Sequence, residues 1–228
     1  MSNTNNKGNQ QYWEENIEGF SGFYDTISEE NIHGVSWFTW LYKKTMFPIE
    51  KKYMMIGHKT VSDYIDKNAK PGMKVTDIGC GSGVYTKIML SKGAFVYGLD
   101  YTQRAVSLTE KKFKSENSEN YEIRVFDITK SKIPEVDIAI SIGVLLYINN
   151  LDTYLDNVLP YTGSFLLNFL DLNHPLNRIR KLIPFFDVRN YNYHKLRDIK
   201  KGIAGHGFSI VRQTKLATGF IIECKRKN

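Results

Sequence analysis

The chain has 228 residues, of which 42% are hydrophobic and 24% charged, so its composition is that of a globular protein with a sizeable core. No stretch approaches the ~18 apolar residues that predict a membrane-spanning helix, and the polar N-terminus lacks the apolar core of a signal peptide. Two cysteines, Cys80 and Cys224, are too few for a disulfide framework or a zinc site. We therefore expect a cytoplasmic protein.

The net charge of +7 comes from the last quarter of the chain. Residues 171–228 contain 13 basic and 4 acidic side chains, whereas residues 1–170 are close to neutral. A local basic surface suits a phosphate-bearing small molecule, an anionic lipid surface or RNA, and charge alone does not choose among them. It is also compatible with a solvated face that binds nothing.

The first 70 residues differ in pattern from the rest. Residues 1–11 are polar, and we expect a disordered tail. Residues 12–70 are rich in aromatic side chains and should form a helical cap over the domain that follows. Within this cap, Pro48 fits the first turn of a helix that runs to about Asn68.

From residue 71 onward, apolar strands and amphipathic helices alternate, which is the pattern of βαβ crossovers and a parallel sheet. Strands are expected at 74–78, 95–100, 121–126, 136–140 and 163–170, and helices at 84–92, 102–115 and 150–158. An insertion with a short helix at about 171–192, a helix at 193–204 and a hairpin of strands 208–213 and 220–224 complete the chain. Residues 71–228 thus predict an α/β, Rossmann-like doubly wound sheet of about seven strands, mostly parallel, with an antiparallel C-terminal hairpin strand.

Three glycines follow the first predicted strand at alternate positions, in the sequence Asp77-Ile78-Gly79-Cys80-Gly81-Ser82-Gly83. Glycine permits a sharp turn and lets a ligand approach the main chain, and amides at the start of the next helix can meet an anionic group. A dinucleotide fingerprint would need Gly or Ala where Val84 stands, which makes a reductase the weakest interpretation. The stretch instead resembles the first motif of class I S-adenosylmethionine-dependent methyltransferases.

This resemblance implies S-adenosylmethionine as cofactor and gives roles to residues at the ends of successive strands. Asp100 would accept hydrogen bonds from both ribose hydroxyls, because a carboxylate has two oxygens for a vicinal diol. Tyr101 would lie against adenine, and Asp127 would accept from the adenine amino group beside the amide of Ile128. The predicted cofactor-binding residues are Asp77, Gly79, Cys80, Gly81, Gly83, Asp100, Tyr101, Asp127, Ile128, Ser141 and Tyr24.

Candidate catalytic residues lie on loops at the carboxyl ends of the predicted strands, where sites gather in such sheets. Tyr147 stands where small-molecule methyltransferases of this type often have a histidine. His174 follows the fifth strand, and His194 opens the last predicted helix. His58 is a further candidate base in the N-terminal cap. No metal is predicted, because Ser141 stands where metal-dependent catechol-type enzymes have an acid.

The loop Ser141-Ile142-Gly143-Val144 lacks the Asp/Asn-Pro-Pro-aromatic motif of enzymes that methylate nucleobase amines, which argues against such an acceptor. The segments Gly57-His58-Lys59-Thr60-Val61 and Gly207-Phe208 are loosely similar to magnesium-protoporphyrin O-methyltransferases, and the architecture also serves bacterial tailoring enzymes. We expect methylation of a small, anionic, phosphate-bearing metabolite such as an activated sugar or a surface-polysaccharide precursor, with O-methylation favoured over N-methylation. Alternatives are an RNA methyltransferase that uses the basic C-terminal face and a non-catalytic binding module; a homodimer is compatible with either.

Overall fold

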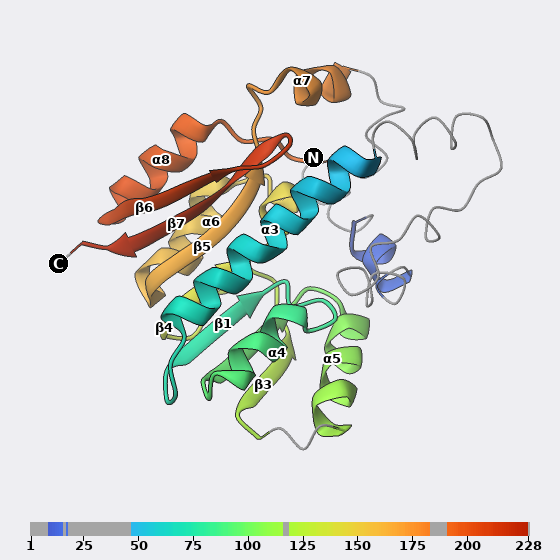
Figure 1. The fold of residues 1–228 in the computed structure, drawn as a ribbon, viewed down its shortest axis with the longest axis vertical. Helices are drawn as coiled ribbons and strands as arrows, with labels where there is room; N and C mark the ends of the chain where they lie inside the picture. Colours follow the sequence, from blue (N-terminus) through green and yellow to red (C-terminus); the bar gives the residue numbers. More distant parts are fainter. Residues whose placement is uncertain (1–8, 16, 18–46, 116–118, 183–190, 228) are drawn as a thin grey trace.

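The computed structural model describes residues 9–15, 17, 47–115, 119–182 and 191–227. Figure 1 shows a central sheet with helices on both of its faces. The strands are β1 (Lys74–Ile78), β2 (Phe95–Asp100), β3 (Tyr121–Val125), β4 (Val136–Ser141), β5 (Thr162–Leu170), β6 (Phe208–Lys215) and β7 (Gly219–Arg226). The helices are α3 (Phe47–Asn68), α4 (Val84–Ser91), α5 (Gln103–Ser115), α6 (Leu151–Val158), α7 (Pro175–Leu182) and α8 (Leu196–Gly205), with 3-10 turns η2 (Leu145–Tyr147) and η3 (Leu159–Tyr161).

The sheet has the order β3-β2-β1-β4-β5-β7-β6, and its first five strands along the chain are parallel. β7 lies between β5 and β6 and is antiparallel to both. The expected seven-stranded, mostly parallel sheet with an antiparallel C-terminal strand is therefore confirmed. The strand order reverses between β1 and β4, and a ligand crevice is expected outside the carboxyl ends of the strands at that point.

Two large hydrophobic clusters hold most of the helices to the sheet, and a smaller one joins α5 to β3 through Val106, Phe113 and Ile123. On one face α3 and α4 pack on the central strands through Val61, Ile65 and Met89. On the other face α6 and α8 bury Leu155, Ile203 and their neighbours against the sheet. The central parallel strands β1, β4 and β5 are buried along most of their length, as expected for strands covered on both faces, whereas the edge strand β3 buries only Ile123.

Local capping explains why several helices begin where the sequence predicts. The Asn150 side chain accepts a hydrogen bond from the amide of Thr153 and caps α6, and the Thr102 hydroxyl does the same for the amide of Ala105 in α5. Asn150 has an extended backbone, so its side-chain oxygen faces the first unpaired amides of α6.

Two boundaries differ from expectation. The last helix was predicted from Tyr193, but α8 begins at Leu196. The amide and carbonyl of His194 instead pair with Leu170 and Leu172 at the end of β5, which holds this segment extended. At the other end of the chain, residues 9–15 are helical, so the helix includes the last three residues of the expected disordered tail. None of the helices within the described ranges is both long and apolar enough to cross a membrane.

Candidate active site

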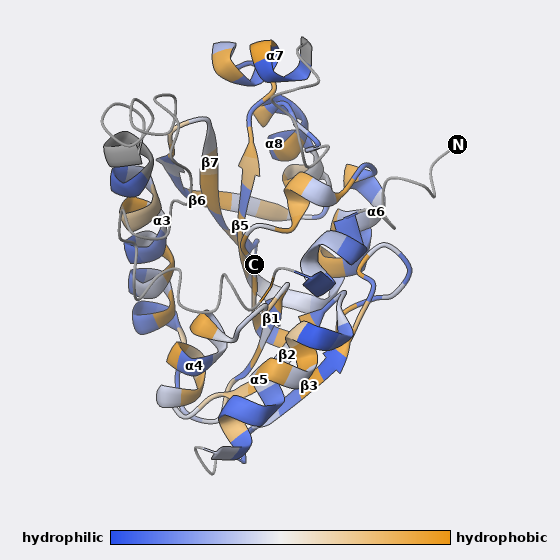
Figure 2. Cartoon of the chain, turned by 90° about the vertical axis from the view of Figure 1, so that its right-hand side faces the viewer, coloured by the Kyte–Doolittle hydropathy of each residue, from blue (hydrophilic) through white to orange (hydrophobic). Residues whose placement is uncertain are grey.

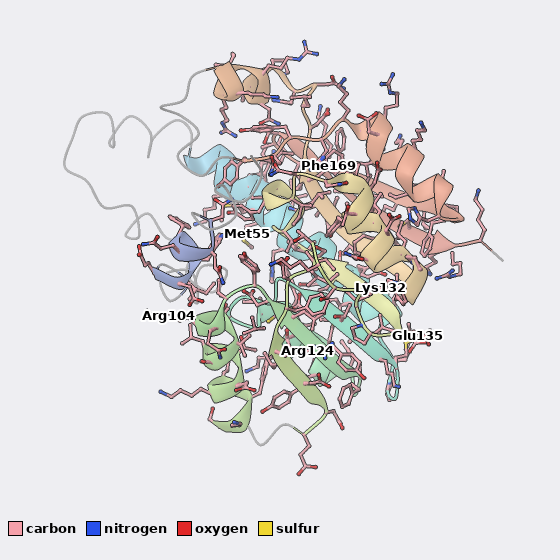
Figure 3. All side chains as sticks on the ribbon, turned by 180° about the vertical axis from the view of Figure 1, so that it is seen from behind. Met55, Arg104, Arg124, Lys132, Glu135 and Phe169 are labelled. Carbon is pink, nitrogen blue, oxygen red and sulfur yellow. The ribbon has the colours of Figure 1, made fainter. Side chains whose placement is uncertain are left out.

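A cavity of about 570 Å³ opens at the carboxyl ends of β1, β2 and β4, within the size range typical of ligand sites. Its walls come from the loops that follow these strands, from residues after β3, and from the N-terminal helix. In Figure 3 this helix lies beside the start of α5, where Arg104 is labelled. The lining residues include Trp13, Ile17, Met54, Gly79, Cys80, Gly81, Asp100, Tyr101, Phe126, Asp127, Ile128, Val144, Tyr147 and Tyr191.

The glycine turn after β1 lies directly against the cavity. Gly79 has φ +74°, and a Cβ there would fall inside van der Waals contact with Val144 Cγ2. The amide of Gly79 donates to the carbonyl of Leu99 at 2.6 Å, which ties the turn to the end of β2. Any side chain at Gly79 would thus strain the backbone and displace the loop after β4.

Asp100 joins the end of β2 to the glycine turn. Its Oδ2 accepts a hydrogen bond from the amide of Gly81 at 3.0 Å, and its Oδ1 accepts from the amide and hydroxyl of Thr102, both at 2.9 Å. Burial raises the pKa of the Asp100 carboxyl, while these hydrogen bonds oppose the shift. The carboxylate is held by the main chain at the cavity wall and retains lone pairs for a ligand diol.

Asp127 lines the cavity from the loop after β3. Its Oδ1 accepts from the amide and hydroxyl of Thr129, at 3.0 and 2.6 Å. Its buried Oδ2 lies 2.9 Å from Lys130 Nζ but receives no well-aligned hydrogen bond from the described residues. Burial alone would raise the pKa of Asp127, but the contacts with Thr129 and Lys130 lower it below the usual value. A charged acceptor with spare capacity therefore faces the cavity.

These features form a cradle that fits a nucleoside carrying a cation. Asp100 can accept from a diol and Asp127 from an exocyclic amine, while Phe126 and Ile128 offer apolar surface to a base. Among the described lining residues, Asp100 and Asp127 are the charged side chains, and both are acidic. A positively charged ligand is favoured by that electrostatic environment.

Three predicted cofactor-binding residues, Asp77, Gly83 and Ser141, do not line the cavity. The Thr86 hydroxyl donates to Asp77 Oδ2 at 2.7 Å, and burial raises the pKa of Asp77 to about 7. Ser141 accepts a hydrogen bond from the hydroxyl of Tyr154 at 2.6 Å inside the core. Gly83 faces Thr109 and has no space for a side chain.

Cys80 lines the cavity as a small, buried side chain, as expected, and burial raises the pKa of its thiol. Tyr101 and Ile128 also lie in the wall. Tyr24 lies outside the described residues. Among those that are described, no group of three His, Cys, Asp or Glu side chains is arranged to hold a metal ion.

An aromatic cluster forms part of the cavity wall. The ring of Tyr147 lies 6.0 Å from that of Trp13, nearly perpendicular to it, and 5.8 Å from the ring of Tyr191. These side chains come from η2, the N-terminal helix and the segment before α8. They are far apart in the sequence, and folding brings them together. Of the candidate catalytic residues, Tyr147 is thus the one that reaches the cavity.

The three candidate histidines are placed elsewhere. His194 Nε2 lies 3.3 Å from the carbonyl of Leu145 and 3.1 Å from that of Ile148, and the residue does not line the cavity. Burial lowers the pKa of His194, so the neutral ring is favoured and can donate to these carbonyls. His174 precedes α7 outside the cavity wall, and His58 stacks on Tyr85 at 5.7 Å. Their positions favour structural roles over base catalysis.

Sequence reasoning missed the part that the N-terminal helix plays in the site. Glu14 accepts hydrogen bonds from the amides of Gln103 and Arg104, at 2.9 and 3.1 Å, and so anchors this helix to the start of α5. Trp13 is thereby placed at the cavity. The aromatic richness of the segment was a signal of packing but did not identify which ring would line the site.

Residues 69–179 match the family model described as a methyltransferase domain. The chain is 32% identical over 84 residues to ribosomal protein L11 methyltransferase of Caldanaerobacter subterraneus subsp. tengcongensis, and 43% identical over 47 residues to ubiquinone biosynthesis O-methyltransferase of Aromatoleum aromaticum. These matches cover 36% and 20% of this chain and only 27% and 20% of the relatives.

Among solved structures, magnesium protoporphyrin IX methyltransferase from Synechocystis PCC 6803, with bound SAH, superposes with a TM-score of 0.71. The two chains are 22% identical, and the match covers 96% of this chain and 98% of the other. A SAM-dependent methyltransferase from Aquifex aeolicus has a TM-score of 0.54 at 15% identity, over 72% and 88% of the two chains. Residues 69–179 thus match a methyltransferase domain, and the chain shares the Rossmann-like fold of these solved methyltransferases.

Proposed function

We propose that this protein transfers a methyl group from S-adenosylmethionine to a hydroxyl of a flat, largely apolar small molecule. The observation that carries the proposal is the meeting of the Gly79–Gly83 turn and Asp100 at one cavity wall, joined by the 3.0 Å hydrogen bond from Gly81. Asp100 would hold the ribose, Asp127 the adenine amino group, and Phe126 and Ile128 the faces of the base. Bound there, S-adenosylmethionine supplies a methyl group on a cationic sulfur.

The acceptor side of the cavity supports a flat apolar substrate. Trp13, Tyr147 and Tyr191 offer ring surfaces, and Ile142 and Leu146 add aliphatic ones. No lysine, arginine or histidine is found among the described lining residues, so a phosphate group would have no cation to pair with there. For this reason we prefer a hydroxylated aromatic acceptor to the phosphate-bearing metabolite that the basic C-terminal segment suggested.

Tyr147 is the side chain proposed to orient the acceptor. It lies in η2, and its loop is held by His194 and by a 2.7 Å hydrogen bond from the amide of Asn192 to the carbonyl of Leu146. A fixed ring beside the transfer site can align the acceptor oxygen and exclude water. Methyl transfer depends mainly on such alignment and water exclusion, because it needs little covalent chemistry from the protein. The likeness to named O-methyltransferases is consistent with an oxygen acceptor.

The cofactor half of the proposal is tested by calorimetric titration with S-adenosylhomocysteine. Asp100→Asn removes the negative charge but keeps one acceptor oxygen, so we expect an affinity at least about tenfold weaker from the loss of a charge-assisted hydrogen bond. Asp152→Ala, at an exposed acid in α6, removes the same charge elsewhere and should bind as the parent does. Equal affinity of the Asp100→Asn variant would refute the role of Asp100.

The acceptor half is tested by release of S-adenosylhomocysteine from S-adenosylmethionine with two substrate panels, hydroxylated aromatics and nucleotide sugars. Turnover confined to the aromatic panel, with kcat reduced in Tyr147→Leu, which removes the ring, at unchanged cofactor affinity, would support the proposal. Turnover confined to the nucleotide sugars would refute the apolar acceptor. Cofactor binding with no turnover in either panel would favour the non-catalytic module.

A further inference from the structure

Helix α7 packs with a polar residue inward and apolar residues outward. Asn177 is completely buried, and its amide Nδ2 donates to the carbonyls of Asp171 and Thr218, each at 2.7 Å. Leu176 and Ile179 are 45% and 50% exposed. At about 100° per residue, they point about 100° and 160° away from Asn177 around the helix axis. This outer face of α7, formed by Leu176 and Ile179, reverses the usual orientation of an amphipathic helix on a domain.

Basic residues are concentrated in α7 and at α8. The helix contains no acidic residue, and α8 with the residue before it adds further cations against a single acid, Asp198. The basic residues are Arg178, Arg180 and Lys181 in α7 and Lys195, Arg197, Lys200 and Lys201 at α8, and all but the half-buried Arg180 are exposed. Figures 1 and 2 both place α7 and α8 toward the same end of the molecule, with α7 projecting beyond the sheet.

We propose that the outer face of α7 docks on an anionic lipid surface. Leu176 and Ile179 would enter the interface between headgroups and acyl chains, while the flanking cations meet lipid phosphates. Two half-exposed side chains on a projecting helix offer far less than the ~800 Å² per partner that a stable protein interface buries. A bilayer needs no such preformed complementary surface, because lipids rearrange around a small convex element. The negative charge of an anionic bilayer also complements the basic residues at this end of the protein.

The position of α7 gives this docking a direction. The helix follows the carboxyl end of β5 after a short turn, at the same edge of the sheet as the cavity. Docking would therefore turn the cavity edge of the domain toward the membrane. The inference concerns surface binding and does not depend on which acceptor is methylated.

The experiment is sedimentation of the full chain with vesicles of phosphatidylcholine alone or mixed with phosphatidylglycerol. We expect binding to the mixed vesicles that weakens as salt is added. The double variant Leu176→Ser/Ile179→Ser should lower the partition coefficient about tenfold, because the apolar anchor is lost. Its matched control is Met55→Ser/Val125→Ser, which removes side chains that are 47% and 48% exposed on α3 and β3 and should bind like the parent.

The charge contribution is tested in the same way. Arg178→Gln/Arg180→Gln, on the two sides of the outer face, should weaken binding to the mixed vesicles, whereas Lys111→Gln/Lys114→Gln, at exposed lysines of α5, should not. No binding to mixed vesicles, equal binding to neutral vesicles, or equal effects of both serine pairs would overturn the proposal. So would a concentration-dependent dimer that is lost in Leu176→Ser/Ile179→Ser without any vesicle binding, since a second copy would then be the occupant of this face.

Discussion

Substitution of Gly79 with alanine should destabilise the protein through two separable effects. The residue has φ +74°, and a left-handed conformation costs a non-glycine residue about 1–2 kcal/mol. The new Cβ would also press into Val144 Cγ2, and overpacking of this kind costs about 1–3 kcal/mol. We therefore expect the free energy of unfolding to fall by about 2–5 kcal/mol in Gly79→Ala, measured by urea denaturation.

Two further variants separate these effects. Gly72 has φ +79° and nothing within 4 Å of an added Cβ, so Gly72→Ala should show the backbone cost alone. In the double variant Gly79→Ala/Val144→Ala the nearest Val144 atom would be Cβ at 3.8 Å, which is an ordinary contact. The clash should disappear, and a double-mutant cycle should therefore give a favourable coupling of about 1–3 kcal/mol.

The cavity provides an independent measurement. Because Gly79 lines the cavity and Gly72 does not, only Gly79→Ala should weaken binding of S-adenosylhomocysteine. The reasoning would be refuted if Gly79→Ala cost no more stability than Gly72→Ala. It would also be refuted if the losses from Gly79→Ala and Val144→Ala simply added.

Two buried groups, Asp77 and His194, should make the stability of the protein depend on pH, and one variant tests each effect. Asp77 has its pKa raised from 3.8 to about 7 in the fold, so the stability that it contributes is present below pH 3.8 and lost as the pH rises to 7. At ~1.4 kcal/mol per pKa unit, the free energy of unfolding should fall by about 4 kcal/mol over this range. Asp77→Asn cannot ionise, so urea titrations of this variant should no longer show that fall. His194 has its pKa lowered, so its contribution is present above its unfolded value of about 6.5 and is lost as the pH falls below it. His194→Gln, which can still donate to one of the two carbonyls, should flatten that acid-side decline, and an unchanged pH profile would contradict a buried neutral ring.

Much of the core could be predicted from the chain because its signals are local. Alternating strands and helices, the caps Thr102 and Asn150, and the glycines after β1 each depend on the conformational preferences of a few neighbouring residues. Position at the end of a parallel strand also placed Asp100 and Asp127 at the correct edge of the sheet, because the carboxyl ends of β1, β2 and β3 lie together there.

The direction in which a side chain points was decided only by packing. Asp77 and Ser141 follow the same strand-end rule as Asp100, but their neighbours Thr86 and Tyr154 hold them in the core. His194 was expected in a helix, yet pairing with the end of β5 keeps its segment extended and turns its ring toward the carbonyls of η2.

Residues distant in sequence meet at the site and on the surface for the same reason. Trp13, Tyr147 and Tyr191 form one wall of the cavity although no local pattern links them. Likewise, the apolar residues of α7 face outward because the buried Asn177 takes the inner side. The sequence by itself determined most of the secondary structure and the glycine turn after β1, since those depend on short-range conformational energies. The acceptor wall and the outer face of α7 were decided by tertiary structure, since they depend on which distant segments come into contact.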